Sequence, residues 1–301
     1  MAAINIEQLT KDYGNNKGIF DLSLTVEEGE VFGFLGPNGA GKTTTMRHLL
    51  GFIKAQSGKA SILELDCWNE AKAIQQHLGY LPAEIAFPDN MTGTQLIEHT
   101  AKMRGIHNTA RAGQLVEMFD LDSSVQIKRM SKGMKQKVGI VCAFMHDPQI
   151  LILDEPTTGL DPLMQSIFVE LIHQEKQKGK SILMSSHLFE EIEDTCDRIA
   201  MIKQGRLVSV ADSQSIKQLD KTTFKIGFRE LRDFISIQQE SFFIREVHQE
   251  SLHVIVDVEN VQLNSLLRAL SKLDVTDIHE IKSSLEDSFM SFYKGGSQSH
   301  V

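Results

Sequence analysis

The chain has 301 residues, of which 41% are hydrophobic and 24% are charged, as in an ordinary globular protein. Its formal net charge of −9 argues against a general nucleic-acid binder, which needs a basic face. The three cysteines lie far apart, without metal-ligand spacing, and indicate reduced intracellular thiols. No apolar run reaches the length of about 18 residues that a membrane-spanning helix needs. We therefore expect a cytoplasmic protein.

The chain from Ile4 to about Val210 alternates short apolar strands with helical stretches. Two N-terminal segments alternate polar and apolar residues with period two, as half-buried strands do. They are Ile4–Leu9 and Phe20–Val26. Four later segments are almost entirely apolar, which is typical of strands buried on both faces of a parallel sheet. They are Val31–Leu35, Ile150–Leu153, Ser181–Met184 and Arg198–Ile202.

A glycine-rich loop, GPNGAGKTT, lies between the apolar strand at 31–35 and a helical stretch. A strand before G-x-x-x-x-G-K-[ST] and a helix after it identify a phosphate-binding loop, although a glycine turn before an ordinary helix is the plainer alternative. Loop amides and the helix N-terminus suit an anion, Lys42 can reach the β- and γ-phosphates, and the Thr43 hydroxyl can bind Mg²⁺. The predicted nucleotide contacts are Gly36, Pro37, Asn38, Gly39, Ala40, Gly41, Lys42, Thr43 and Thr44.

Three predicted helices follow and form an insert in the α/β core, at Thr94–Arg104, Thr109–Phe119 and Lys132–His146. Ser131 is a natural N-cap for the third helix, and Gly133 permits close backbone approach. A second helix N-terminus able to hold phosphate is best explained if it closes over the nucleotide of a partner chain. An ordinary capped helix fits the local sequence equally well.

Two further apolar strands are followed by polar side chains, the first by the acidic pair Asp154 and Glu155 and the second by His187. Asp154 can orient Mg²⁺, and Glu155 can act as the general base that polarises water. His187 can contact the γ-phosphate or the water at the carboxyl edge of the sheet, where such sheets bind ligands. A strand that ends in solvated acids, and a surface histidine, are the structural alternatives. With Lys42, the residues Glu155 and His187 form the predicted catalytic set.

A different pattern begins after about Ala211. It predicts two strand–helix–strand halves joined by a hairpin, which is the βαββαβ arrangement. The strands are Thr222–Phe228, Phe242–Val247, Leu252–Val258 and Val275–Lys282, and the helices are Glu230–Gln238 and Gln262–Lys272, with a last helix at Leu285–Tyr293. The polar tail from Gly295 to Val301 is expected to be disordered.

Taken together, the motifs resemble those of the ATP-binding subunits of ABC transporters over roughly residues 4 to 215. The matching features are, in chain order, the aromatic residue Tyr13 and the motifs GPNGAGKTT, LGYLPAE, MSKGMKQK, ILILDEP, TTGLDP and SSH. The resemblance implies an α/β fold with a P-loop NTPase core of the ABC ATPase type. We expect an ATP-binding domain at residues 1–215, with the helical insert at about 85–146, and a small C-terminal α+β domain at 216–301.

The resemblance also implies ATP and Mg²⁺ as ligands, and two such domains packed head to tail around two ATP molecules. Each ATP then contacts the phosphate loop of one chain and Ser131 and Gly133 of the other. Tyr13 stacks on adenine, or alternatively is a buried strand-edge tyrosine. Asp161 lies at the dimer interface and couples the two sites, and it can serve at the same time as a helix N-cap.

The sequence departs from the family pattern at two places. Lys132 and Met134 replace a glycine and the glutamine of the usual leucine-serine-glycine-glycine-glutamine motif. Ala83 replaces a glutamine that family members offer to Mg²⁺, so Glu84 is the candidate metal ligand there. The segments that contain these departures, LPAE and SKGMKQK, resemble those of the ATPases of bacterial two-component exporters. Such exporters include the drug-resistance and antibiotic self-immunity type.

We therefore predict an ATPase that powers export through a separate integral-membrane permease, on the cytoplasmic face of the cell membrane. A homodimer is expected, although pairing with a related ATPase fits too, and no nucleic acid is expected. The helical insert and the loop near Phe87 should contact the permease, with Phe87 as an exposed apolar group that binds it. The alternative for Phe87 is that it only packs the insert onto the core. The alternative is a non-transport ABC-type ATPase that acts on ribosomes or nucleic acid, which the acidic charge disfavours. Three roles fit the C-terminal domain, namely dimer contact, regulation and ligand sensing.

Overall fold

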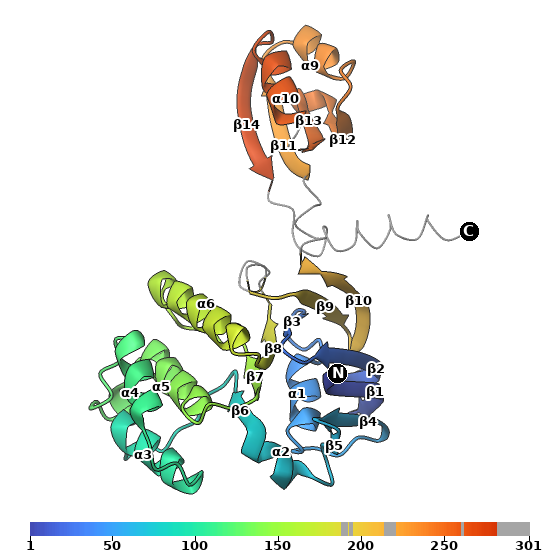
Figure 1. The fold of residues 1–301 in the computed structure, drawn as a ribbon. Helices are drawn as coiled ribbons and strands as arrows, with labels where there is room; N and C mark the ends of the chain where they lie inside the picture. Colours follow the sequence, from blue (N-terminus) through green and yellow to red (C-terminus); the bar gives the residue numbers. More distant parts are fainter. Residues whose placement is uncertain (188–191, 193–194, 214–220, 260–261, 282–301) are drawn as a thin grey trace. The chain divides into compact units, whose positions relative to one another are not determined.

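The protein divides into two compact units, residues 1–213 and 214–301, which are described separately (Figure 1). The structure is a computed structural model that describes residues 1–187, 192, 195–213, 221–259 and 262–281. The sequence places the division between residues 215 and 216. The helix expected at Leu285–Tyr293 and the tail from Gly295 lie outside the described residues. Among the helices that the structure describes, none has the length and apolar character needed to cross a membrane.

An antiparallel sheet with the strand order β2-β1-β4-β5 begins the first unit. Its side chains alternate between buried and accessible, as the period-two pattern of the first two strands predicts. The first strand bears Ile4 and Ile6 in the core. The later strands were not predicted, because β4 carries glycine, serine and lysine rather than an apolar pattern. The strands are β1 (Ala2–Asp12), β2 (Gly18–Glu27), β4 (Ser57–Ile62) and β5 (Leu65–Asp66).

A second sheet forms the centre of this unit, with the strand order β10-β9-β3-β8-β7-β6. Five strands are parallel, and β10 is an antiparallel edge strand. The apolar runs form strands buried along almost their whole length, which confirms the predicted parallel sheet. The strands are β3 (Val31–Leu35), β6 (Leu78–Leu81), β7 (Ile150–Asp154), β8 (Ser181–Ser186), β9 (Arg198–Lys203) and β10 (Arg206–Asp212).

Strand register in this sheet sets the position of the candidate site. Asp154 pairs with Ser185, and Leu35 pairs with Ser186, so β3, β7 and β8 end at the same level. The glycine-rich loop, the acidic pair and the residues before His187 therefore leave the sheet at one edge. This is the edge at which open α/β sheets bind ligands.

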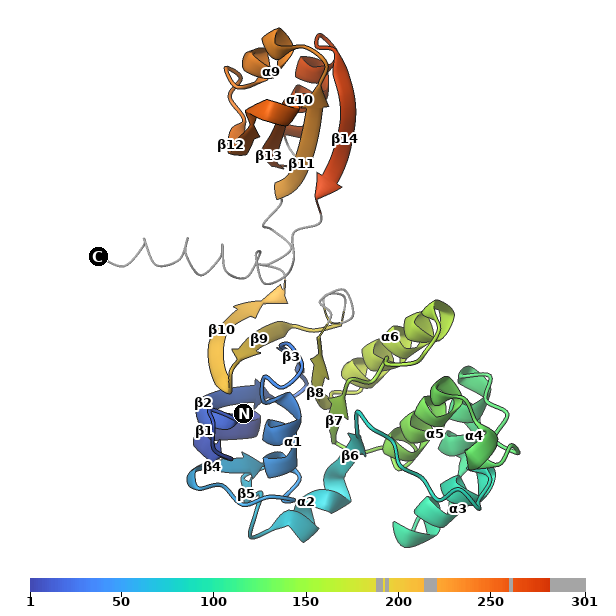
Figure 2. The same cartoon turned by 180° about the vertical axis from the view of Figure 1, so that it is seen from behind.

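Six helices of the first unit have defined bounds among the described residues. Helices α3, α4 and α5 lie together at the side of the second sheet away from β1 and β2, which is the predicted helical insert (Figures 1 and 2). Helix α2 was not predicted, and of α6 only the start was expected, through Asp161 as an N-cap. The helices are α1 (Lys42–Leu49), α2 (Ala71–His77), α3 (Gly93–Met103), α4 (Ala110–Met118), α5 (Lys132–Phe144) and α6 (Pro162–Gln177), with a 3₁₀ turn, η1, at Ile127–Arg129.

The second unit is an antiparallel sheet with the order β12-β13-β11-β14, and two helices cover one face. Phe234 and Ile237 of α9, and Leu266 and Leu270 of α10, pack on buried strand residues in one core. The element order confirms the predicted βαββαβ arrangement. The elements are β11 (Lys221–Phe228), α9 (Leu231–Ile237), β12 (Phe243–His248), a 3₁₀ turn, η2 (Gln249–Ser251), β13 (His253–Glu259), α10 (Leu263–Leu270) and β14 (Val275–Ile281).

Candidate nucleotide-binding site

The loop between β3 and α1 folds tightly against the core, and two of its glycines are required for steric reasons. A Cβ atom at Gly36 would lie 2.4 Å from the carbonyl oxygen of Ile202. At Gly41, φ is 115° and a Cβ atom would lie 2.8 Å from Ile19. Other side chains would therefore displace the loop and with it the N-terminus of α1. The first amides of α1 have no partner within the helix and are available to an anion.

Lys42 opens α1 and is buried, with its ammonium inside the curve of the loop. Its Nζ donates hydrogen bonds to the carbonyl oxygens of Gly36 at 2.5 Å and of Pro37 at 3.4 Å. It also forms an ion pair with Glu155, at 3.2 Å between Nζ and Oε1. The side chain is thus fixed over the loop at the place where the motif requires its positive charge.

Asp154 is fully buried at the end of β7 and accepts hydrogen bonds from two hydroxyl groups. Thr43 Oγ1 donates to Oδ2 at 2.7 Å, and Ser185 Oγ donates to Oδ1 at 2.5 Å. The structure therefore brings together two of the predicted metal residues, Thr43 and Asp154. Sequence reasoning missed Ser185, although its place at the end of a buried strand was a usable signal.

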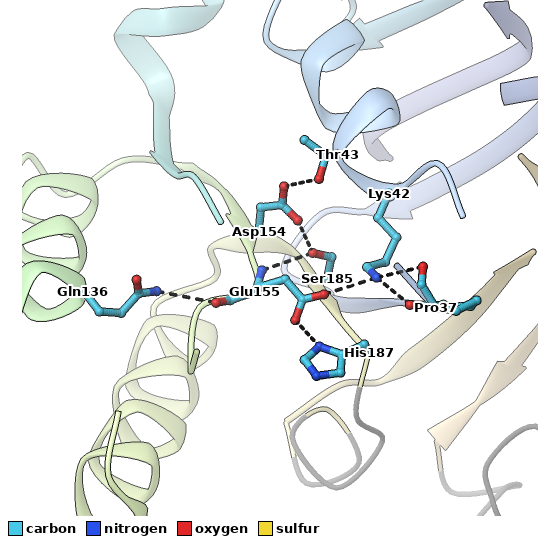
Figure 3. A network of polar contacts seen from close by, with 9 residues as sticks. Pro37, Lys42, Thr43, Gln136, Asp154, Glu155, Ser185 and His187 are labelled. Atoms are coloured by element: carbon cyan, nitrogen blue, oxygen red, sulfur yellow. Dashed lines mark hydrogen bonds and ion pairs between the residues drawn. The ribbon is translucent and has the colours of Figure 1, made fainter. Parts of the chain in front are cut away.

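Glu155 joins the loop, the acidic strand and the imidazole group (Figure 3). Its Oε2 lies 2.6 Å from Nδ1 of His187, and its Oε1 faces Lys42. Its amide is held at the end of β8, since the N–H lies 3.2 Å from both the carbonyl oxygen and the hydroxyl oxygen of Ser185. The three predicted catalytic residues are thereby neighbours.

A cavity of about 580 Å³ opens over Lys42, Thr43 and Glu155, whereas Asp154 and His187 do not line it. Its volume falls within the range of about 300 to 1,000 Å³ that small-molecule sites occupy. Tyr13, Glu84 and most of the phosphate loop line it, as predicted contacts, and so does Ala83. Sequence reasoning missed Lys17, which also lines the cavity. Its carbonyl accepts a hydrogen bond from the Tyr13 amide at 2.8 Å, so one tight turn presents both side chains.

The predicted partner-chain residues do not line this cavity. Ser131 is exposed and caps α5, because its Oγ accepts a hydrogen bond from the Met134 amide at 3.1 Å. Asp161 is exposed and caps α6 in the same way, through the Met164 amide at 3.0 Å. Within the described chain these residues and Gly133 are therefore separate from the phosphate loop site.

In the loop after Glu84, the side chain of Phe87 is half-buried, which leaves both alternatives for it, contact with the permease and packing of the insert onto the core, as predictions. Tyr13, in contrast, is exposed rather than a buried strand-edge residue, and the ammonium of Lys11 lies 5.8 Å from the centre of its ring. The accessible ring leaves a face on which a planar base can stack.

The donor set suits a nucleotide with Mg²⁺. In the described part of the chain, no three His, Cys, Asp or Glu side chains are arranged to hold a metal ion by themselves. Mg²⁺ usually takes one or two protein oxygens together with substrate phosphates, and Thr43 and Asp154 offer such oxygens beside the phosphate loop.

Comparison with known proteins gives consistent matches. Residues 19–158 match the model of the ABC transporter family. The bacitracin transport ATP-binding protein BcrA of Bacillus licheniformis is 34% identical over 300 residues, which cover 97% of this chain and 98% of the relative. The linearmycin resistance ATP-binding protein LnrL of Bacillus subtilis is 34% identical over 212 residues, which cover 69% of this chain and 68% of the relative.

Solved structures share the fold of the first unit. The ATP-binding subunit of an ABC transporter has a TM-score of 0.65 and 30% identity, over 71% of this chain and 92% of that one. A dimeric bacterial ABC transporter cassette has a TM-score of 0.63 at 21% identity, over 70% of this chain and 98% of that one. The two matches cover 71% and 70% of this chain, and the first unit holds 213 of its 301 residues.

Proposed function

Because this chain belongs to the ABC transporter family of ATP-binding subunits, which hydrolyse ATP, we propose that it powers export through a separate integral-membrane permease. The observation that carries the proposal is the contact of Lys42 and His187 with the Glu155 carboxylate beside the phosphate loop. This places a cation for phosphate and a base for water in one cavity, with an imidazole in contact with the base. No observation favours the alternative of an ATPase that acts on ribosomes or nucleic acid.

The residues divide the work of hydrolysis. Lys42 and the first amides of α1 stabilise the negative charge that develops on the phosphate oxygens. Glu155 accepts a proton from water, and His187 holds the Glu155 carboxylate through Oε2. Bound Mg²⁺, held by Thr43 and Asp154, would neutralise charge between the phosphates.

The proposed site is complete only in a dimer. Ser131 and Gly133 lie apart from the cavity of their own chain, while Ser131 is exposed at the start of α5. In a head-to-tail pair, this helix N-terminus would close over the nucleotide that the partner's phosphate loop holds. Asp161, exposed at the start of α6, would lie at the same interface. The dimeric form of a structurally similar cassette supports this arrangement.

The direction of transport is proposed from the relatives. One is named for bacitracin transport and the other for linearmycin resistance, which favours export of a toxic compound. The chain would then act at the cytoplasmic face of the membrane, with its permease as a separate polypeptide.

The test purifies the tagged full-length chain from detergent-solubilised membranes and measures its ATP affinity and hydrolysis, alongside Lys42→Ala. We expect a membrane-embedded protein to accompany the chain and to change its hydrolysis rate. Lys42→Ala should abolish ATP binding because the phosphates lose their cation, whereas Lys72→Ala, an exposed lysine on α2, should bind normally. Unchanged ATP affinity in Lys42→Ala would reject the phosphate-loop assignment. A chain confined to the soluble fraction would reject the permease.

A further inference from the structure

We propose that Gln136 is a positioning residue for hydrolysis, through which helix α5 holds the backbone of Glu155 in the geometry that activates water. The proposal rests on the proposed role of Glu155 as the general base. It adds a link between the start of α5, which is proposed to meet the partner's nucleotide, and the hydrolytic group of the same chain.

The contact itself joins the helical insert to the core. Gln136 lies in the second turn of α5 and is only 2% exposed. Its Nε2 donates a hydrogen bond to the carbonyl oxygen of Pro156 at 2.7 Å. It also lies 3.5 Å from the carbonyl oxygen of Glu155, and this contact is drawn in Figure 3. The amide therefore holds the peptide groups that follow the general base.

Glu155 needs such support because its backbone conformation is unfavourable. Its φ is 50°, in the left-handed region that non-glycine residues rarely adopt. Ser185 fixes its amide, and Lys42 and His187 fix its carboxylate. Gln136 fixes the carbonyl side, so without it the residue can relax and the carboxylate can turn away from its water.

A second contact ties the same helix to the same loop. A Cβ atom at Gly133 would lie 2.6 Å from the carbonyl oxygen of Gly159, so the first turn of α5 packs directly on the backbone of the loop. A Cβ atom at Gly159 would in turn lie 3.1 Å from Cγ of Lys132. The helix start and the loop from Glu155 to Gly159 thus form one packed unit.

This arrangement gives a physical route between the two sites of the proposed dimer. The turn that carries Ser131 and Gly133 is proposed to contact the partner's nucleotide. A shift of that turn would pass through Gln136 to Glu155, which directly follows the carboxyl end of strand β7. A contiguous packed network of this kind can carry coupling between sites.

The test replaces Gln136 by methionine, which has similar length without a donor, and by glutamate, which turns an acceptor toward the carbonyl oxygens. We expect kcat to fall by about 10- to 100-fold, since small misplacements of a catalytic group have effects of this size. The ATP affinity should stay within about twofold, because Gln136 does not line the cavity. The matched control is Gln238→Met in the second unit, where Nε2 also donates to a backbone carbonyl oxygen, of Phe234 at 2.9 Å.

A double-mutant cycle separates positioning from a general structural role. If Gln136 acts through Glu155, Gln136→Met should cause no further loss of the slow residual single-turnover hydrolysis in a Glu155→Gln background. Full additivity, a kcat within twofold of wild type, or an equal loss of ATP affinity would overturn the proposal. The wild-type rate in Glu155→Gln alone would instead reject the proposed function.

Discussion

Two adjacent carboxylates at the end of β7 have different surroundings, and these surroundings separate their roles. Asp154 is enclosed and accepts hydrogen bonds from Thr43 and Ser185, which suits a carboxylate that orients a metal and its waters. Glu155 faces the cavity between Lys42 and His187, which suits a group that exchanges a proton. The pattern Asp-Glu after an apolar strand predicted the pair, but the sequence did not reveal the hydroxyl of Ser185 that fixes both residues.

Glu84 is the candidate metal ligand in the loop where Ala83 takes the place of the usual glutamine. It lines the cavity beside Ala83, which offers no ligand atom, and it is exposed. If Glu84 binds Mg²⁺ directly or through water, Glu84→Ala should raise the Mg²⁺ concentration for half-maximal hydrolysis several-fold, with a smaller effect on ATP affinity. The control is Glu98→Ala, an exposed acid on α3. An unchanged Mg²⁺ dependence would remove Glu84 from the metal site.

At the scale of elements, a buried ion cluster attaches the helical insert to the core. Glu175 at the end of α6 is fully buried and pairs with Arg111 of α4 at 2.5 Å, Lys178 at 2.8 Å and Lys180 at 2.5 Å. Lys180 also contacts Asp147, in the connection between α5 and β7. Burial alone would raise the pKa of Glu175, but the hydrogen bonds from the two lysines outweigh it and lower the pKa.

Glu175→Gln should therefore lower the free energy of unfolding by about 3 kcal/mol at neutral pH, because it leaves the buried Lys180 and the half-buried Arg111 without this carboxylate. Because the pKa of Glu175 is lower in the folded protein, the ion cluster contributes its full stability above pH 4.5, the pKa of this carboxyl in the unfolded chain. That contribution is lost as the pH falls through the lower pKa of the folded state. Denaturant unfolding of the two proteins should thus converge in acid. The exposed neighbour Glu170→Gln should behave like wild type, and an equal loss in both variants would contradict the explanation.

The elements that the sequence predicted share a strong local pattern. The buried strand at Val31–Leu35 is a continuous apolar run, and helices α3 and α5 of the insert carry side-chain N-caps. The structure places these elements within one or two residues of the prediction. Strands β4 and β10 were missed because they are largely accessible, so their pairing with β1 and β9 rather than an apolar pattern defines them. Gln136 was missed for a related reason, since its partners are backbone carbonyl groups distant in sequence.

At the scale of the molecule, the two units have separate cores. The BcrA match spans nearly the whole chain, whereas the LnrL match covers 69% of it. Phe234→Ala removes a ring that is 2% exposed in the second core, so it should destabilise that unit by about 3 kcal/mol. Hydrogen exchange should rise in β11 and β13 and stay unchanged in β3 and β7, with normal ATP affinity. Phe243→Ala, 65% exposed in the same unit, is the control. A matching loss of ATP affinity would show that the units are energetically coupled.

Each chain is proposed to hold half of a nucleotide site, which a second chain completes. Glu155→Gln keeps the phosphate contacts and removes the base, so the variant should bind ATP, hydrolyse it only at a slow residual rate and remain closed. The most direct measurement is sedimentation of Glu155→Gln with and without Mg²⁺-ATP, together with its rate of hydrolysis. We predict a stable dimer only with nucleotide, and hydrolysis reduced to a slow residual rate. A monomer that binds ATP, or turnover at the wild-type rate, would contradict it.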